Sequence, residues 1–149
     1  MYTKLTNSEL MTKQLKLKQQ LEQYTKDSFV NFTMDKFNDF REVLHELSNI
    51  KTELALRNAL IKVEYNGKEI PVVELINIKM EFLESKTLLD NVIQSPNIAN
   101  AVNSNSNVIL QITNLLNEIT TELTKIHKIL NDINNRILDN DIKQIPHRN

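Results

Sequence analysis

The sequence predicts an all-α fold, an antiparallel bundle of about four helices with a small β-hairpin between the second and third helices. Three observations lead to this prediction. Residues 108–138 have the apolar periodicity of one long helix, three earlier segments share that periodicity, and residues 61–70 alternate between apolar and polar side chains. A helix of about thirty residues is about 45 Å long. We therefore expect the other helices to pack along it.

The long predicted helix carries two adjacent apolar rows. One row follows alternating steps of four and three residues, with Glu122 as an interruption, and the other repeats every seven residues. The rows are Val108, Ile112, Leu115, Ile119, Ile126, Ile129 and Ile133, and Leu116, Leu123, Leu130 and Ile137. Two rows make a face wider than a two-stranded coiled-coil seam, and covering it takes two or more neighbouring helices.

Two amphipathic helices are expected before the alternating segment. Thr6 and Glu9 form a capping box at the start of the first, because each side chain can accept a hydrogen bond from the backbone N–H of the other. The apolar stripes are Leu10, Leu17, Leu21 and Tyr24 in residues 7–26, and Phe37, Phe40, Leu44, Leu47 and Leu54 in residues 34–60. Lys51 and Asn58 share the second stripe, where polar residues fix register or oligomeric state, or line a polar pocket.

The alternating segment predicts a hairpin turning at Asn66-Gly67, since both residues tolerate positive φ. A lone two-stranded hairpin is only marginally stable in water, so it must pack against the bundle or pair with another copy of itself. Pro71 suits the start of a third helix. That helix, residues 71–94, has one row of Val73, Ile76, Met80 and Leu83 and a second of Val72, Leu75, Phe82 and Leu89.

The remaining segments are polar. Residues 96–107 are biased to Asn and Ser and predict a loop, and little in the tail after Leu138 can pack. We expect one helical domain over residues 1–138 and a frayed tail over 139–149.

Composition and charge exclude several classes of protein. The 149 residues include no cysteine, which excludes disulfides and thiolate chemistry. A net charge of -1, with 18 basic and 19 acidic residues and no basic stripe, argues against nucleic-acid binding. No apolar run approaches the roughly 20 residues that span a bilayer, and the start has no apolar signal core. We expect a cytoplasmic protein without nucleic-acid or membrane partners.

The sharpest candidate for a metal site is Glu42 with His45, a Glu-x-x-His spacing that puts both groups on one helix face. Carboxylate-bridged sites need a second such pair, and His127 has Thr124 where the glutamate should be. No serine or threonine lies in a glycine-flanked elbow, and a single glycine cannot build a phosphate loop. We therefore expect no metal, no cofactor and no enzymatic activity.

A polar end of the bundle is the best candidate for a binding surface. Its residues are Lys51, Arg57, Asn58 and Lys62 near the end of the second helix, Lys68 on the returning strand, and Lys79 in the third helix. Cations beside an amide can hold a phosphorylated or other anionic ligand. The alternative interpretation is a solvated charged end with Glu64 and Glu69 as counter-ions.

The order of elements also points to a family. The features are a helix ending in Arg57-Asn58, the excursion Asn66-Gly67-Lys68-Glu69-Ile70, a third helix, and a Ser/Asn-rich gap before a long last helix. In these features, residues 40–137 resemble the septicolysin-like family of small bacterial and phage-borne helical proteins. Where members commonly carry an Ala-Arg-Arg-Asp-like run, this chain has Ile76-Asn77-Ile78-Lys79. The resemblance implies the fold and no particular activity.

Two hypotheses for the function follow. The first is a non-enzymatic homo-oligomer that captures a small anionic or nucleotide-like ligand, in a sequestering or inhibitory role of phage origin. Such a protein would sequester a signal or block a host protein. The second hypothesis is a structural or adaptor protein that acts by protein–protein contact through its helical faces. Four helices of unequal length cannot cover both rows of the long helix, so we expect self-association through that helix and the hairpin edge.

Overall fold

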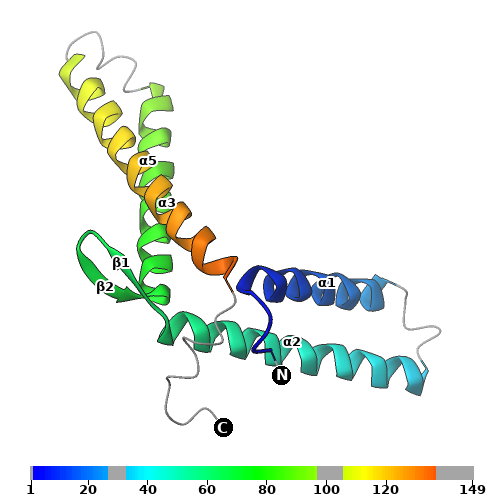
Figure 1. Cartoon of the computed structure of the whole chain (residues 1–149). Coiled ribbons are helices and arrows are strands. Elements are labelled where there is room, and N and C mark those ends of the chain that lie inside the picture. The colour runs from blue at the N-terminus through cyan, green and yellow to red at the C-terminus, as the bar shows by residue number, and fades with distance from the viewer. Residues whose placement is uncertain (1, 27–32, 97–105, 137–149) are drawn as a thin grey trace. The chain divides into compact units, whose positions relative to one another are not determined.

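The computed structural model describes residues 2–26, 33–96 and 106–136 (Figure 1). The elements are α1 (Asn7–Lys26), α2 (Met34–Leu60), β1 (Lys62–Tyr65), β2 (Lys68–Pro71), α3 (Val72–Gln94) and α5 (Ser106–Asn134). In these residues, four helices accompany one antiparallel two-stranded hairpin, which connects α2 to α3. The predicted fold class is confirmed.

The chain divides into two compact units. The first unit contains α1, α2 and the chain from Asp132 onward. The second unit runs from Val63 to Asn131 and contains most of the hairpin, α3 and the greater part of α5. One domain over residues 1–138 stays a prediction, because a compact unit is not by itself an independently folding domain.

The ends of α5 differ most from the prediction. It begins at Ser106, and it ends at Asn134, before the expected Leu138. Asparagine is a weak helix former. The side chains of the two asparagines at this end, Asn134 and Asn135, accept hydrogen bonds from α1. The Asn7 side-chain amide donates to Asn134 Oδ1 at 3.3 Å, and the Ser8 hydroxyl donates to Asn135 Oδ1 at 3.0 Å.

Helix α1 packs along α2 in the first unit (Figure 1). Its capping box is present, with Glu9 N–H donating to Thr6 Oγ1 at 3.1 Å and Thr6 N–H donating to Glu9 Oε2 at 2.8 Å. The core of the unit consists of Leu10, Leu17, Leu47 and Ile50, flanked by Tyr2, Leu5, Leu21, Val43 and Leu54.

The predicted stripe of α1 faces α2, but the stripe predicted for α2 was only partly right. Leu47 is buried, whereas Phe37 and Leu44 are 40 % and 42 % exposed and Lys51 is exposed. Ile50, which lies outside the predicted stripe, is fully buried.

The hairpin turns where the sequence predicts. Asn66 has φ 51° and Gly67 has φ 77°, which is the left-handed conformation that both residue types tolerate. Val63 and Ile70 point to the buried side of the hairpin, and Val72 and Leu75 are buried at the start of α3. Apolar burial, and not the two short strands alone, holds the hairpin in place.

The rest of the chain covers only part of the apolar face of α5. Ile119, Ile126 and Leu130 are buried, whereas Val108 is 41 % and Leu115 is 44 % exposed. The expectation that part of the face stays open in one chain is met at the beginning of α5.

No helix in the described part of the chain is long and apolar enough to span a bilayer. The predicted tail over residues 139–149 and most of the predicted loop over residues 96–107 lie outside the described residues.

Candidate functional site

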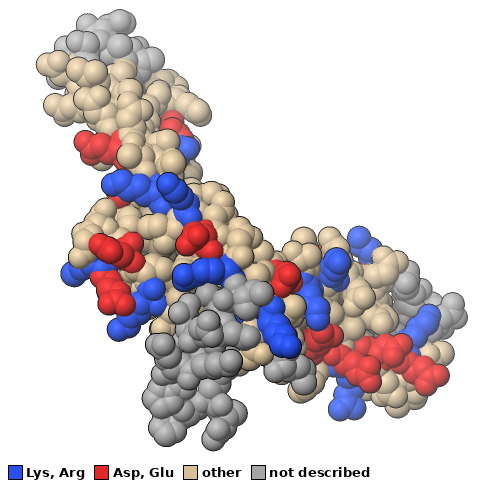
Figure 2. Space-filling view, viewed as in Figure 1, with Lys and Arg blue, Asp and Glu red and all other residues tan. Residues whose placement is uncertain are grey.

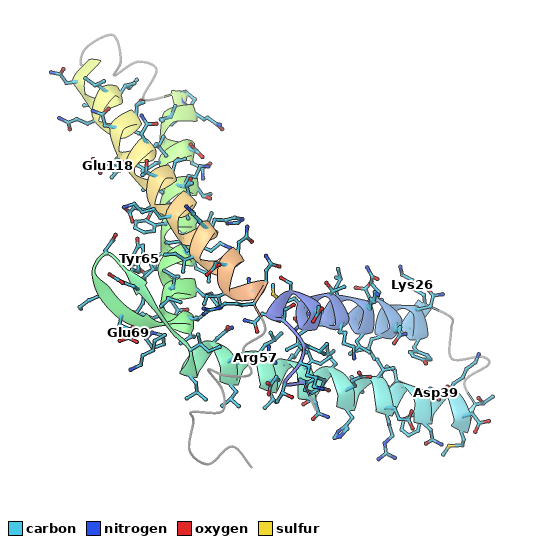
Figure 3. The ribbon with its side chains drawn as sticks, viewed as in Figure 1. Lys26, Asp39, Arg57, Tyr65, Glu69 and Glu118 are labelled. Atoms are coloured by element: carbon cyan, nitrogen blue, oxygen red, sulfur yellow. The ribbon has the colours of Figure 1, made fainter. Side chains whose placement is uncertain are left out.

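Arg57 is the most completely buried charged residue that the structure describes, with 1 % of its surface exposed. It lies one helical turn after Glu53 on α2, so the two side chains meet on the same face. The Nε–H of Arg57 donates to Glu53 Oε1 at 3.0 Å, and Glu53 is itself 8 % exposed. Figure 3 labels Arg57 on α2, close to the beginning of the chain.

The other donors of Arg57 hold the segment before α1. Its Nη1 donates to the Leu5 carbonyl at 2.8 Å and to Asn7 Oδ1 at 3.0 Å, and its Nη2 donates to the Tyr2 carbonyl at 2.8 Å. A buried guanidinium needs such partners, because desolvation without them is very costly. Arg57 is therefore a structural anchor for this segment. In the same segment, burial raises the pKa of the Tyr2 phenol, and the carboxylates of Glu46 and Glu53 raise it further.

The six predicted ligand residues lie in different surroundings. Lys51, Lys62 and Lys68 are exposed, Asn58 and Lys79 are half-buried, and Arg57 is buried. Lys51, Asn58 and Lys62 belong to the first unit, and Lys68 and Lys79 belong to the second. Arg57 does not belong to an exposed cationic set, because its guanidinium turns inward. The ligand site itself stays a prediction.

A groove of about 400 Å³ lies against α1 and α2 in the first unit. It is lined by Tyr2, Leu5, Lys13, Glu42, His45, Glu46 and Asn49. Glu42 and His45 share this groove, as their spacing predicts, and Lys13 pairs with Glu46 across it at 3.7 Å. Among the described residues, no three His, Cys, Asp or Glu side chains gather closely enough to hold a metal ion. The absence of a functional metal remains a prediction.

A polar pair joins the hairpin to α5 in the second unit. The Tyr65 hydroxyl donates to Glu122 Oε2 at 2.5 Å, and Lys125 Nζ donates to Glu122 Oε1 at 2.9 Å. Burial and the Glu122 carboxylate raise the pKa of Tyr65 to about 12. The hydrogen bonds from Tyr65 and Lys125 lower the pKa of Glu122. Each group thus keeps its partner in the protonation state that the bond requires. Figure 3 shows Tyr65 on the hairpin.

The second unit exposes large apolar side chains along both of its helices. On α3 they are Val73, Met80, Leu83, Leu88, Val92 and Ile93, and on α5 they are Val108, Leu110 and Leu115. Their exposed fractions range from 36 % for Ile93 to 65 % for Leu88. The sequence has no charged residue between Asp90 and Glu118. In Figure 2 the described surface around the end of α3 and the beginning of α5 is tan, the colour of residues other than Lys, Arg, Asp and Glu.

The comparisons with known proteins give no match. No protein-family model fits the chain, and no curated protein or solved structure is significantly similar to it. Nothing in the comparisons bears on the resemblance to the septicolysin-like family.

Sequence reasoning missed the anchoring role of Arg57 and the Tyr65–Glu122 pair. The i,i+4 spacing of Glu53 and Arg57 was the available signal for the first. For the second, the signal was Glu122 itself, because an acidic side chain in an apolar row must find a donor when the row is covered.

Proposed function

We propose that this protein is a non-enzymatic, self-associating adaptor that acts by protein–protein contact through exposed apolar helix faces in the cytoplasm. The observation that carries the proposal is the set of nine large apolar side chains exposed on α3 and α5. Large apolar side chains exposed on successive turns of a helix mark an interaction site more often than a solvated face.

The magnitude of this exposure supports the proposal. The exposed fractions of the nine side chains amount to roughly four complete residues. Covering them is worth about 6 to 12 kcal/mol per chain at about 1.5 to 3 kcal/mol for each fully buried side chain. Association costs about 4 to 15 kcal/mol. Covering this surface on two chains is worth about 18 kcal/mol at the middle of the first range, and association costs about 9.5 kcal/mol at the middle of the second. The difference of about 8 kcal/mol corresponds to a micromolar dissociation constant.

Capture of a small anionic or nucleotide-like ligand receives less support. Arg57, the strongest bidentate donor of the predicted set, is engaged by Glu53 and by the segment before α1. The exposed members that remain are single lysines, each of which offers a point charge on a flexible stem.

A thermal-shift experiment tests the proposal. A protein stabilised by self-association melts at a higher temperature as its concentration rises, since mass action favours the assembled folded state. We expect this dependence over a hundredfold range of protein concentration, and no shift with nucleotides, cyclic nucleotides or inorganic phosphate. A melting temperature that rises with one of these anions and ignores protein concentration would contradict the adaptor function and favour capture.

A further inference from the structure

Helix α3 has two apolar rows, and only one of them is packed inside the second unit. Val72 and Leu75 are 1 % and 0 % exposed, and Phe82 and Leu89 continue this inner row half-buried. The other row consists of Val73, Ile76, Met80 and Leu83, with Thr87 as its continuation. We call it the outer row. In the outer row, Val73 is 41 %, Met80 is 51 % and Leu83 is 39 % exposed, Thr87 is exposed and Ile76 is half-buried.

The spacing of the outer row is that of a two-stranded coiled-coil seam. Its members follow steps of three, four, three and four residues, so Val73, Met80 and Thr87 take the a positions and Ile76 and Leu83 take the d positions of two heptads. Asp90 takes the next d position and ends the seam. A single row, unlike the double row of α5, matches one facing helix.

The residues beside the seam indicate which helix faces it. Lys79 and Lys86 take the g positions, and Asn77 and Glu84 take the e positions. In a parallel coiled coil, a g residue faces the e residue five positions further along the partner. Lys79 of one copy therefore faces Glu84 of a second copy, and the twofold axis makes this pair twice.

The opposite orientation is disfavoured by the same charges. An antiparallel arrangement sets g positions against g positions, which would bring lysines together, and e positions against e positions, which would leave Glu84 facing Asn77 or a second Glu84 and no cation. Within the single chain, neither Lys79 nor Glu84 makes an ion pair with any described residue. Both charges are thus available to a second chain.

We infer that the occupant of the outer row is a second copy of this chain, bound through α3 in a parallel, in-register, two-stranded seam with reciprocal Lys79–Glu84 pairs. The inference rests on the proposed function and specifies the partner and the surface. It places the interface on α3, whereas the sequence alone favours the long helix and the hairpin edge.

Charge reversal tests the pairing. Lys79→Glu and Glu84→Lys each place like charges at both reciprocal contacts, so each variant alone should dimerise about tenfold more weakly at low salt. The double variant should regain the parent's dissociation constant to within about threefold. An equimolar mixture of the single variants, one of them ¹⁵N-labelled, should give mostly heterodimers in native mass spectrometry, because both contacts then join opposite charges. Glu81→Lys, at an outward b position, is the matched control and should dimerise like the parent.

Cysteine cross-linking tests the parallel orientation of the two α3 helices. Because the chain has no native cysteine, any disulfide must come from the introduced residue. In a parallel seam, Met80 faces Met80 of the second copy. Met80→Cys should therefore form an intermolecular disulfide under mild oxidation by copper–phenanthroline, whereas Glu81→Cys should not. The full-length chain is used throughout.

The outcomes separate the inference from the proposed function. A parent protein that is dimeric or larger but indifferent to the Lys79 and Glu84 reversals, or a Met80→Cys variant that does not cross-link, overturns the seam and leaves self-association standing. A parent that stays at 17.4 kDa up to high micromolar concentration overturns both.

Discussion

At the scale of single residues, the chain's polar groups act mainly inside the fold. Arg57 donates hydrogen bonds to a carboxylate on α2, to the side-chain oxygen of Asn7 at the start of α1, and to two carbonyls of the segment before α1. Its position at the end of a predicted helix, near several lysines, could not distinguish an anchor from a ligand-binding residue. The distinction depends on the path of residues 2–7, which no local pattern encodes.

Removing this anchor should be strongly destabilising. Arg57→Ala removes the buried ion pair with Glu53 and the hydrogen bonds to the Tyr2 and Leu5 carbonyls, so we expect a loss of about 3 to 5 kcal/mol in the free energy of unfolding. Lys51→Ala, an exposed cation on the same helix, should change it by less than about 0.5 kcal/mol. Urea denaturation followed by circular dichroism measures both. A small effect of Arg57→Ala would contradict the anchoring role.

The Tyr65–Glu122 pair predicts pH dependence at both ends of the scale. The pKa of Tyr65 is raised to about 12, so its contribution to stability is complete below pH 10 and is lost as the pH rises from 10 to about 12. The pKa of Glu122 is lowered, so its contribution is complete above the ordinary value of 4.5 and is lost as the pH falls below it.

Substitution of Tyr65 isolates this dependence. Tyr65→Phe should reduce the fall in stability between pH 10 and 12, as measured by urea denaturation across that range, and Tyr24→Phe is the control. If the alkaline profiles of Tyr65→Phe and the parent coincide, the pair does not couple the hairpin to α5.

At the scale of elements, local patterns predict nearly everything that depends on near neighbours. The bounds of α1 and α2, the capping box and the turn at Asn66 and Gly67 all follow from such patterns and are confirmed. The expected end of α5 at Leu138 was wrong, since the helix ends at Asn134. There, Asn134 and Asn135 accept hydrogen bonds from Asn7 and Ser8, more than a hundred residues away, and no local pattern predicts such contacts. The choice between the two rows of α3 was also open, because both have helical spacing and only packing determines which is covered.

The hairpin offers a test at this scale. Gly67 has φ +77°, and a Cβ added there would meet nothing within 4 Å. Gly67→Val should therefore destabilise through backbone strain alone, by about 1 to 3 kcal/mol. Gly67→Asn should lose less, since asparagine tolerates this conformation. Thermal unfolding of the two variants compares them, and a Gly67→Val protein as stable as the parent would show that the turn conformation is wrong.

At the scale of the whole molecule, the account rests on how apolar side chains are distributed. The first unit has a core between α1 and α2, and the second leaves most of one row of α3 and the beginning of α5 exposed. Large apolar side chains are also exposed in the first unit, among them Leu15 and Met34. An apolar surface of this kind marks a site of contact with a second copy or with another protein. The sequence predicts a homo-oligomer and the two apolar rows of α3. It does not predict which of the two rows stays exposed.

The molar mass of the parent protein tests this central claim most directly. Sedimentation equilibrium of the untagged chain from low to high micromolar concentration should give a mass that rises to at least twice 17.4 kDa. Because the proposed interface is mainly apolar, we expect moderate salt to shift this equilibrium only slightly. A mass of 17.4 kDa over the whole range would mean that the chain covers its own apolar rows, and it would contradict the account.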